Sequence, residues 1–430
     1  VAGFTDATGR LIWSIVGDPA LLPLPYNASW IPNRVDFTVD RVEGQSGGFR
    51  VPADAVQPQP GTGALRRVPE GAVASVKLTY QVSASPFLDG SDTKIADLLY
   101  AFVQAYRWGA KSGPDDRAYE PHVAAAVAEM GDRLVGIRTL RVEKSINRIA
   151  PDVQIVQDRP VLEVYLDDTP GDVQQVAALA APWSTVPWHL MALMEEAVLR
   201  GYAAFSRAEA ERRGVPWLDL VRDEALHERL RDLIDEFEKA GYRPAALQDL
   251  VSEDEARKRW RALRRFAGET GHLLVTNGPY RLKAWTSGRV AFRAVREATY
   301  PLGFGTFDRY VHPLRAVVRR VKREPEGIVV RVDVEKTVKV ARHYEVRRAP
   351  LDRHTGRGTY GALVVSRYLL IGPEGRVVRA GKMQWQRDDR FTVDLPSGLP
   401  PGRYTILSAV YLDGNSLAPS TGVVRFEAQG

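Results

Sequence analysis

The sequence predicts an α+β protein, in which a mixed α/β body with a helical insert is followed by a C-terminal β-sandwich. Helical and strand periodicities alternate up to about residue 316. From about residue 317 the hydrophobic period becomes two, in short runs separated by turn-forming residues. The 430 residues allow two or three domains at roughly 100–200 residues each. We therefore place the body at 1–316, its insert at about 182–268 and the sandwich at 317–430.

The body is predicted to contain a strand that leads into a helix. Val73–Val82 alternates apolar and polar residues, as a half-buried strand does. Between Ile95 and Tyr106 the apolar residues recur at steps of three and four, which indicates a helix with one apolar face. Asp92 or Thr93 is expected to cap the N-terminus of this helix.

Two strands and then three helices are predicted next. The strands are Val135–Val142 and Val161–Leu166, with NRIAPD between them. Helical spacing of apolar residues then predicts helices at Leu190–Phe205, Arg222–Ala240 and Ser252–Phe266. The last of these opens with the serine and glutamate spacing of a capping box, which predicts where it begins.

The remainder of the chain is predicted to be β-structure. His272–Trp285 has the composition of a strand. The segments with period two are GIVVRVDV, ALVVSRYLLIG, RVVRAG, DRFTVDLP, GRYTILSAVYLDG and GVVRFEA. Short strands at this spacing, separated by turns such as PEG and SGLPPG, are typical of a sandwich of the immunoglobulin or fibronectin III type.

Composition argues against several functional classes. The chain has no cysteine, which excludes disulfides, thiolate metal sites and cysteine nucleophiles. Its 59 basic and 53 acidic residues are interspersed, and no basic stripe for nucleic acid is evident. No apolar run reaches the ~18 residues of a membrane span. No two of the seven histidines stand two or four positions apart, and neither a P-loop nor G-x-S-x-G occurs. We expect no catalysis, no metal and no cofactor.

Two tryptophans are notable because they flank a turn-like segment. Trp183 and Trp188 lie in APWSTVPW, just before the helical insert. Large aromatic side chains in irregular segments often line pockets or interfaces. They also pin loops onto a core, and the sequence leaves both roles open.

Three local patterns resemble the extracellular solute-binding proteins of bacterial peptide/nickel importers. The first has Asp89-Gly90 shortly before Ala96-Asp97, where a strand is followed by a helix. The second runs from Gly271 to Tyr280 and ends in NGPY. The third is Ala298–Pro301 followed by Phe307–Tyr310. The long separation between the first two patterns departs from the family, as does a β-sandwich in place of its second lobe.

The resemblance implies a binding protein that captures a small polar ligand or peptide and delivers it to an ABC importer in the membrane. The candidate ligand-binding residues are Asn277, Gly278 and Tyr280, with Trp183 and Trp188. It also implies a periplasmic or extracellular location, and a start at Val1 rather than at methionine favours a processed or trimmed chain. The alternative is a solute-binding fold reused as an accessory subunit of a larger hetero-oligomeric assembly, because the second lobe is missing.

The predicted insert supplies a candidate surface for partner chains. Arginines and lysines crowd residues 257–265, on a helix whose other face is apolar. A solvated helix face is the simpler explanation for such a run. If it is an interface, charge reversal at Arg261, Arg264 and Arg265 is expected to weaken assembly at little cost in stability.

Overall fold

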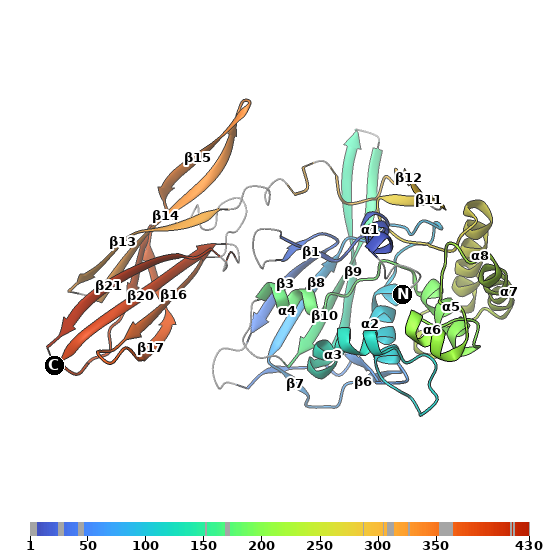
Figure 1. The fold of residues 1–430 in the computed structure, drawn as a ribbon, viewed down its shortest axis with the longest axis horizontal. Helices are drawn as coiled ribbons and strands as arrows, with labels where there is room; N and C mark the ends of the chain where they lie inside the picture. The colour runs from blue at the N-terminus through green and yellow to red at the C-terminus, as the bar shows by residue number, and fades with distance from the viewer. Residues whose placement is uncertain are drawn as a thin grey trace. The chain divides into compact units, whose positions relative to one another are not determined.

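The computed structural model has a mixed α+β architecture with an all-β C-terminal region (Figure 1). It describes residues 7–24, 30–41, 47–150, 153–167, 173–286, 288–303, 305–307, 314–325, 327–351, 364–412, 415 and 418–429. Eight α-helices and several antiparallel sheets lie within these residues. The chain divides into two compact units, Val1–Leu22 with Pro32–Leu302, and Pro23–Ile31 with Gly303–Gly430.

A six-stranded antiparallel sheet forms the centre of the first unit. Its order is β3 (Val35–Arg41), β8 (Val76–Val82), β10 (Val153–Leu166), β9 (Leu134–Ala150), β5 (Val56–Pro58) and β6 (Leu65–Arg67). The predicted strands at 135–142 and 161–166 are confirmed. The predicted strand at 73–82 is confirmed from Val76 onward, whereas residues 73 and 74 belong to a separate short sheet. The hairpin of β9 and β10 is longer than predicted. Strand β8 pairs only with residues 161–166 of β10, and β9 and β10 remain paired with each other beyond that stretch.

The helix α2 (Ile95–Gly109) covers one face of this sheet. Its Leu98 and Phe102 are buried against Leu78 and Leu162 of the strands. The predicted capping residues, Asp92 and Thr93, are wrong. The N-cap residue is Lys94, and its backbone N–H donates to the carboxylate of Asp97 at 2.9 Å. Thr93 instead donates its hydroxyl to the carbonyl of Ser85.

The remaining secondary structure of the first unit consists of helices and short strands around this centre. The helices are α1 (Ala7–Val16), α3 (Pro121–Arg133) and α4 (Val173–Leu179). A short two-stranded sheet pairs β4 (Phe49–Arg50) with β7 (Val73–Ala74). Another pairs β1 (Leu21–Pro23) with β2 (Trp30–Pro32), and residues 23, 30 and 31 of these strands are assigned to the second unit. No described helix combines the length and hydrophobicity that a membrane crossing requires.

The predicted helical insert is a group of helices (Figure 1), whose apolar core also includes residues of α1 and α2. It comprises α5 (Trp188–Leu199), α6 (Arg207–Arg213), α7 (Glu224–Ala240), the 3-10 turn η1 (Ala245–Leu247) and α8 (Glu253–Thr270). Trp188, Phe237 and Trp260 are buried at the centre of this group. The α5 helix ends earlier than predicted, before Gly201, which takes a positive φ of 75°. Ser252 caps α8 as predicted, by accepting from the N–H of Glu255.

Most of the arginines on α8 are engaged within the chain. Arg261 pairs with Glu238 of α7 at 3.1 Å, and Arg264 pairs with the same carboxylate at 3.0 Å. Arg265 donates to the carbonyl of Asp89. These contacts revise the expectation that charge reversal here costs little stability, because a new carboxylate at 264 would face the carboxylate of Glu238.

We therefore expect Arg264→Glu to lower the free energy of unfolding by about 1 kcal/mol. The substitution removes a half-exposed ion pair, which contributes less than about 1 kcal/mol, and it adds repulsion of similar size between two carboxylates. Lys258→Glu is the matched control, because Lys258 is exposed and has no ion pair among the described residues. Urea unfolding of the two variants measures the difference. Equal stability of the two variants would show that the pairing between α7 and α8 contributes nothing.

A hairpin completes the first unit. It consists of β11 (Tyr280–Thr286) and β12 (Arg289–Ala294), which pair in antiparallel register. The predicted strand from His272 to Trp285 is therefore only partly correct. Residues 272–277 are buried but form no strand. The backbone N–H of Leu273 donates to Leu220, that of Asn277 to Thr185, and that of Val275 to Leu273. Residues 308–310 of the third sequence pattern lie outside the described part of the chain.

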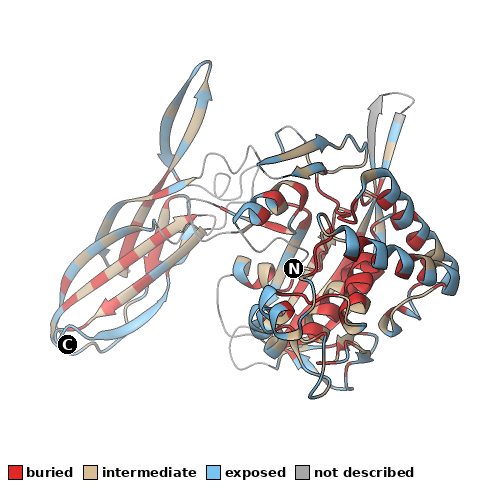
Figure 2. Ribbon diagram, turned by 45° about the vertical axis from the view of Figure 1, so that its right-hand side comes forward, coloured by how far each residue is buried: buried red, intermediate tan, exposed pale blue. Residues whose placement is uncertain are grey.

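The C-terminal region contains two antiparallel sheets that share one core. One sheet has the order β13 (Arg315–Glu324), β14 (Gly327–Val340), β19 (Arg390–Val393) and β18 (Gln384–Arg387), with β15 (His343–Pro350) paired to the far half of β14. The other has the order β17 (Val377–Lys382), β16 (Val364–Ile371), β20 (Gly402–Leu412) and β21 (Ser420–Ala428). Burial alternates along β20, as its sequence predicts (Figure 2). The predicted all-β character of this region is confirmed.

Candidate functional site

Two of the predicted ligand-binding residues, Trp183 and Asn277, lie against a buried ion pair. The guanidinium of Arg34 is fully buried and donates to Asp18 at 2.7 Å. Trp183 donates its indole N–H to the carbonyl of Asp18, and its ring lies 4.8 Å from the Arg34 guanidinium carbon. The carbonyl of Asn277 accepts from Arg34 at 3.4 Å. Tyr300 donates to Asp18, and burial with this nearby carboxylate raises the pKa of Tyr300. The cluster thus joins segments that are distant in the sequence.

The other three predicted residues lie apart from this ion pair. A Cβ on Gly278 would lie 2.2 Å from the carbonyl oxygen of Val16, so only glycine allows this close approach. Trp188 is fully buried and packs edge-on against Trp260 in the helical core. Tyr280 is 43% exposed at the beginning of β11. A ligand-binding role for the five residues stays a prediction.

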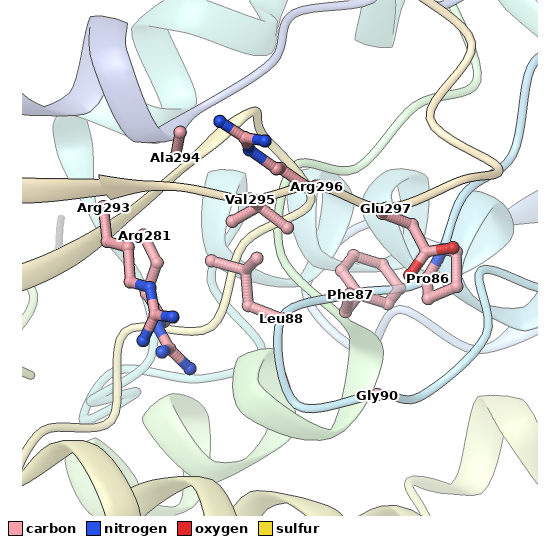
Figure 3. A pocket seen from close by; sticks show the side chains of 10 residues that line it. All are labelled: Pro86, Phe87, Leu88, Gly90, Arg281, Arg293, Ala294, Val295, Arg296 and Glu297. Atoms are coloured by element: carbon pink, nitrogen blue, oxygen red, sulfur yellow. The ribbon is translucent and has the colours of Figure 1, made fainter.

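An open pocket of about 420 Å³ lies between the turn at residues 86–90 and the β11–β12 hairpin (Figure 3). Neither wall includes a residue of the predicted set. The lining residues are Pro86, Phe87, Leu88, Gly90, Arg281, Arg293, Ala294, Val295, Arg296 and Glu297.

The first wall is a tight turn held by backbone hydrogen bonds. The N–H of Gly90 donates to the carbonyl of Phe87 at 2.8 Å, and Gly90 takes a positive φ of 84° that favours glycine. Leu88 donates to the carbonyl of Thr276, which ties the turn to the segment before the hairpin. Behind the turn, the buried carboxylate of Asp89 lies 2.9 Å from the ring of His189. Burial alone would raise the pKa of Asp89, but the hydrogen bond and charge of His189 lower it.

The second wall carries two arginines in register. Arg281 of β11 pairs directly opposite Arg293 of β12. Figure 3 shows their guanidinium groups side by side and extended in the same direction, whereas Arg296 points away from them. No ion pair to a described residue engages Arg281 or Arg293. The hairpin is fixed at its base, where the ring of His272 bonds to the carbonyl of Leu282 at 3.0 Å.

This arrangement suits recognition of an anion. Two adjacent guanidinium groups repel each other unless a negative group lies between or beside them, and their planar donors match a carboxylate or phosphate. The lining residues include a single carboxylate, Glu297, and no serine, threonine, histidine or lysine. They therefore provide binding groups without an evident nucleophile and base pair. Within the described residues, no three His, Asp or Glu side chains gather closely enough to hold a metal ion.

The arginine pair was not predicted from the sequence, although a signal for the hairpin existed. Residues 272–285 have the composition of one long strand, so the hairpin was not anticipated. Gly288 takes a positive φ of 83° in the turn of this hairpin. A turn at that glycine predicts the hairpin, but its register alone would place Arg281 opposite Ala294. An irregularity between Leu282 and Ala284 shifts the register by one residue and brings Arg281 opposite Arg293.

Comparison with known proteins gives no relative from which a function could be transferred. No family model matches this chain, and no curated protein matches it.

Proposed function

We propose that this chain is a non-catalytic extracytoplasmic binding protein of the solute-binding kind, which captures a small polar ligand or peptide through a negatively charged group. The observation that carries the proposal is the pairing of Arg281, which is half-buried, with Arg293, which is exposed, in the wall of the pocket that includes Gly90. In an importer context the captured ligand would pass to an ABC transporter in the membrane.

The positions of the sequence patterns support this proposal. Asp89-Gly90, from the first pattern, forms part of the first wall of the pocket. The NGPY segment, from the second, leads directly into the hairpin that forms the second wall. The patterns that suggest a solute-binding family thus flank the same pocket, although most of their residues do not line it.

The C-terminal region supports the alternative proposal of an accessory subunit. We propose that its two sheets are an immunoglobulin- or fibronectin III-like sandwich, a type of module that often serves to contact other proteins. The shared core, with Ile328 and Val330 on one sheet and Ile406 and Val410 on the other, is consistent with such a sandwich. The two proposals are compatible, because a ligand-binding unit can also be part of an assembly.

Replacing either pocket arginine is expected to weaken binding of an acidic ligand about tenfold or more, because a hydrogen bond to a charged group contributes about 1.5–3 kcal/mol. Suitable probes are succinate, N-acetylglutamate and a tripeptide with a free C-terminal carboxylate, each compared with its neutral amide. Isothermal titration calorimetry measures the affinities for the unaltered chain and for Arg281→Gln and Arg293→Gln.

The control is Arg289→Gln, an exposed arginine on the same hairpin that does not line the pocket. We expect it to leave the affinity unchanged, so that a general loss of positive charge is separated from loss of the pair. If no carboxylate is preferred over its amide, the proposed anion recognition is wrong. If Arg289→Gln weakens binding as much as the pocket variants, the pocket is not the site.

A further inference from the structure

The β17–β16–β20–β21 sheet of the C-terminal region has one covered edge and one open edge. On β21, Ser420 accepts from the backbone N–H of Val318 in β13 at 2.7 Å. The carbonyl of Glu427 accepts from Arg323, also of β13. A Cβ added to Gly422 would lie only 2.4 Å from the side chain of Val321. Contacts with β13 therefore cover β21 along its length.

The opposite edge is β17, and it is uncovered. All six of its residues are exposed, among them Val377 and Val378, which are 56% and 53% exposed. The strand pairs with β16 on one side, and no strand in the described part of the chain pairs with its other side. Figure 2 shows the exposed colour along this strand. The unpaired backbone groups of such an edge are a template for another strand.

The charge around this open edge is positive. Residues 364–382, which span β16 and β17, contain four basic residues and one acidic residue, Glu374. Arg367, Arg376 and Arg379 are exposed, and none has an ion pair to a described residue. Arg379 lies opposite Leu370, which is buried, but Arg379 is itself exposed, like the other residues of β17. An approaching strand would therefore meet cations as well as free backbone groups.

We propose that β17 is a docking edge for an extended acidic segment of a partner protein, which adds to this sheet as a fifth strand. Backbone hydrogen bonds to β17 would supply affinity, and the alternating side chains would supply specificity. Acidic side chains of the partner would meet Arg376 and Arg379, and apolar ones would meet Val377 and Val378. Six residues of strand span about 20 Å, which sets the length of the segment.

Exposed arginines also occur on edge strands simply to prevent aggregation. The two roles differ in their response to a peptide that can form a strand. An edge whose arginines only prevent aggregation does not bind such a peptide. A docking edge binds it, with an affinity that depends on the charge of the peptide.

The test uses the full chain and an eight-residue peptide that alternates glutamate and valine, with blocked ends. Two control peptides replace glutamate with lysine, or carry N-methyl groups on alternate backbone nitrogens so that strand pairing is blocked. Fluorescence anisotropy of labelled peptides gives the affinities. We expect the acidic peptide to bind at least tenfold more tightly than either control peptide.

The double variant Arg376→Glu/Arg379→Glu should weaken binding of the acidic peptide at least tenfold. The matched control Arg320→Glu/Arg425→Glu reverses two exposed arginines at the covered edge and should leave it unchanged. Unaltered melting temperatures show that the variants are folded. Equal binding of the N-methylated peptide, no binding of the acidic peptide, or self-association of the chain through this edge would each overturn the proposal. Binding of succinate to the pocket of the first unit is measured in parallel, so that failure of either proposal is recognised separately.

Discussion

Replacing Asp97 with alanine is expected to lower the free energy of unfolding by about 3–5 kcal/mol, because the substitution removes the only fully buried carboxylate that pairs with Arg259 among the described residues. The guanidinium then keeps only the partly exposed Glu255, at 3.2 Å, as a counter-charge. The Asp97 side chain is fully buried and that of Arg259 is 2% exposed, and their closest atoms are 3.2 Å apart. The same carboxylate accepts from the backbone N–H of Lys94 and from that of Trp188, each at 2.9 Å. One side chain thus ties the first turns of α2 and α5 to α8.

Urea unfolding followed by circular dichroism measures this effect. Asp97→Asn should cost less than Asp97→Ala, because the amide oxygen can still accept from one of the backbone donors. The double variant Asp97→Leu/Arg259→Met should recover part of the loss, because it removes both charges together. A loss of less than about 1 kcal/mol for Asp97→Ala would mean that Glu255 and water are sufficient to satisfy Arg259, and that the buried pair with Asp97 contributes little.

Local sequence patterns were sufficient to predict most helices and strands. The apolar faces of α2, α7 and α8 follow from spacing along one segment, and the beginning of α8 follows from the cap at Ser252. The alternation in β20 predicts a strand whose neighbours cover one side. These features depend on residues that are close in the sequence, which is why the sequence alone reveals them.

Features that depend on distant residues were not predictable in the same way. The apolar run at Leu273–Val275 correctly indicates burial, but it packs among helices and has no strand beside it. The cap of α2 was missed because Thr93 bonds to Ser85 instead. The pairing of Arg281 with Arg293 depends on the register of a hairpin. Sequence patterns nevertheless pointed to both segments that form the walls of the pocket.

The stability of the first unit is expected to fall as the pH is lowered from about 7 to 5, because two buried histidines must remain neutral in the folded state. Burial lowers the pKa of His227, and burial together with the nearby charge of His227 lowers that of His272. His272 accepts from the N–H of Leu274 with Nδ1 and lies 3.0 Å from the carbonyl of Leu282 with Nε2. Protonation of Nδ1 would break the hydrogen bond that it accepts from Leu274.

The sign of this effect follows from the order of the two pKa values. In the unfolded chain a histidine takes up a proton below about pH 6.5, whereas in the folded chain it does so only at lower pH. Between those values the unfolded state binds more protons, so stability falls with decreasing pH by at most about 1.4 kcal/mol per pH unit for each histidine. Above pH 6.5 both states are neutral and the contribution is constant. The lowered pKa of Asp89 acts only below about pH 4, outside this window.

Glu195 makes the opposite contribution, because burial raises its pKa and the folded state then binds the additional proton. The histidine effect is therefore measured as a difference between chains. Urea unfolding at intervals from pH 7.5 to 5 is compared for the unaltered chain, His272→Gln and His227→Gln. Each variant is expected to be less stable at pH 7.5, because a buried hydrogen bond is changed, but to lose less stability on acidification. If all three curves remain parallel over this range, neither histidine resists protonation in the folded state, and the pH dependence must arise from the carboxylates.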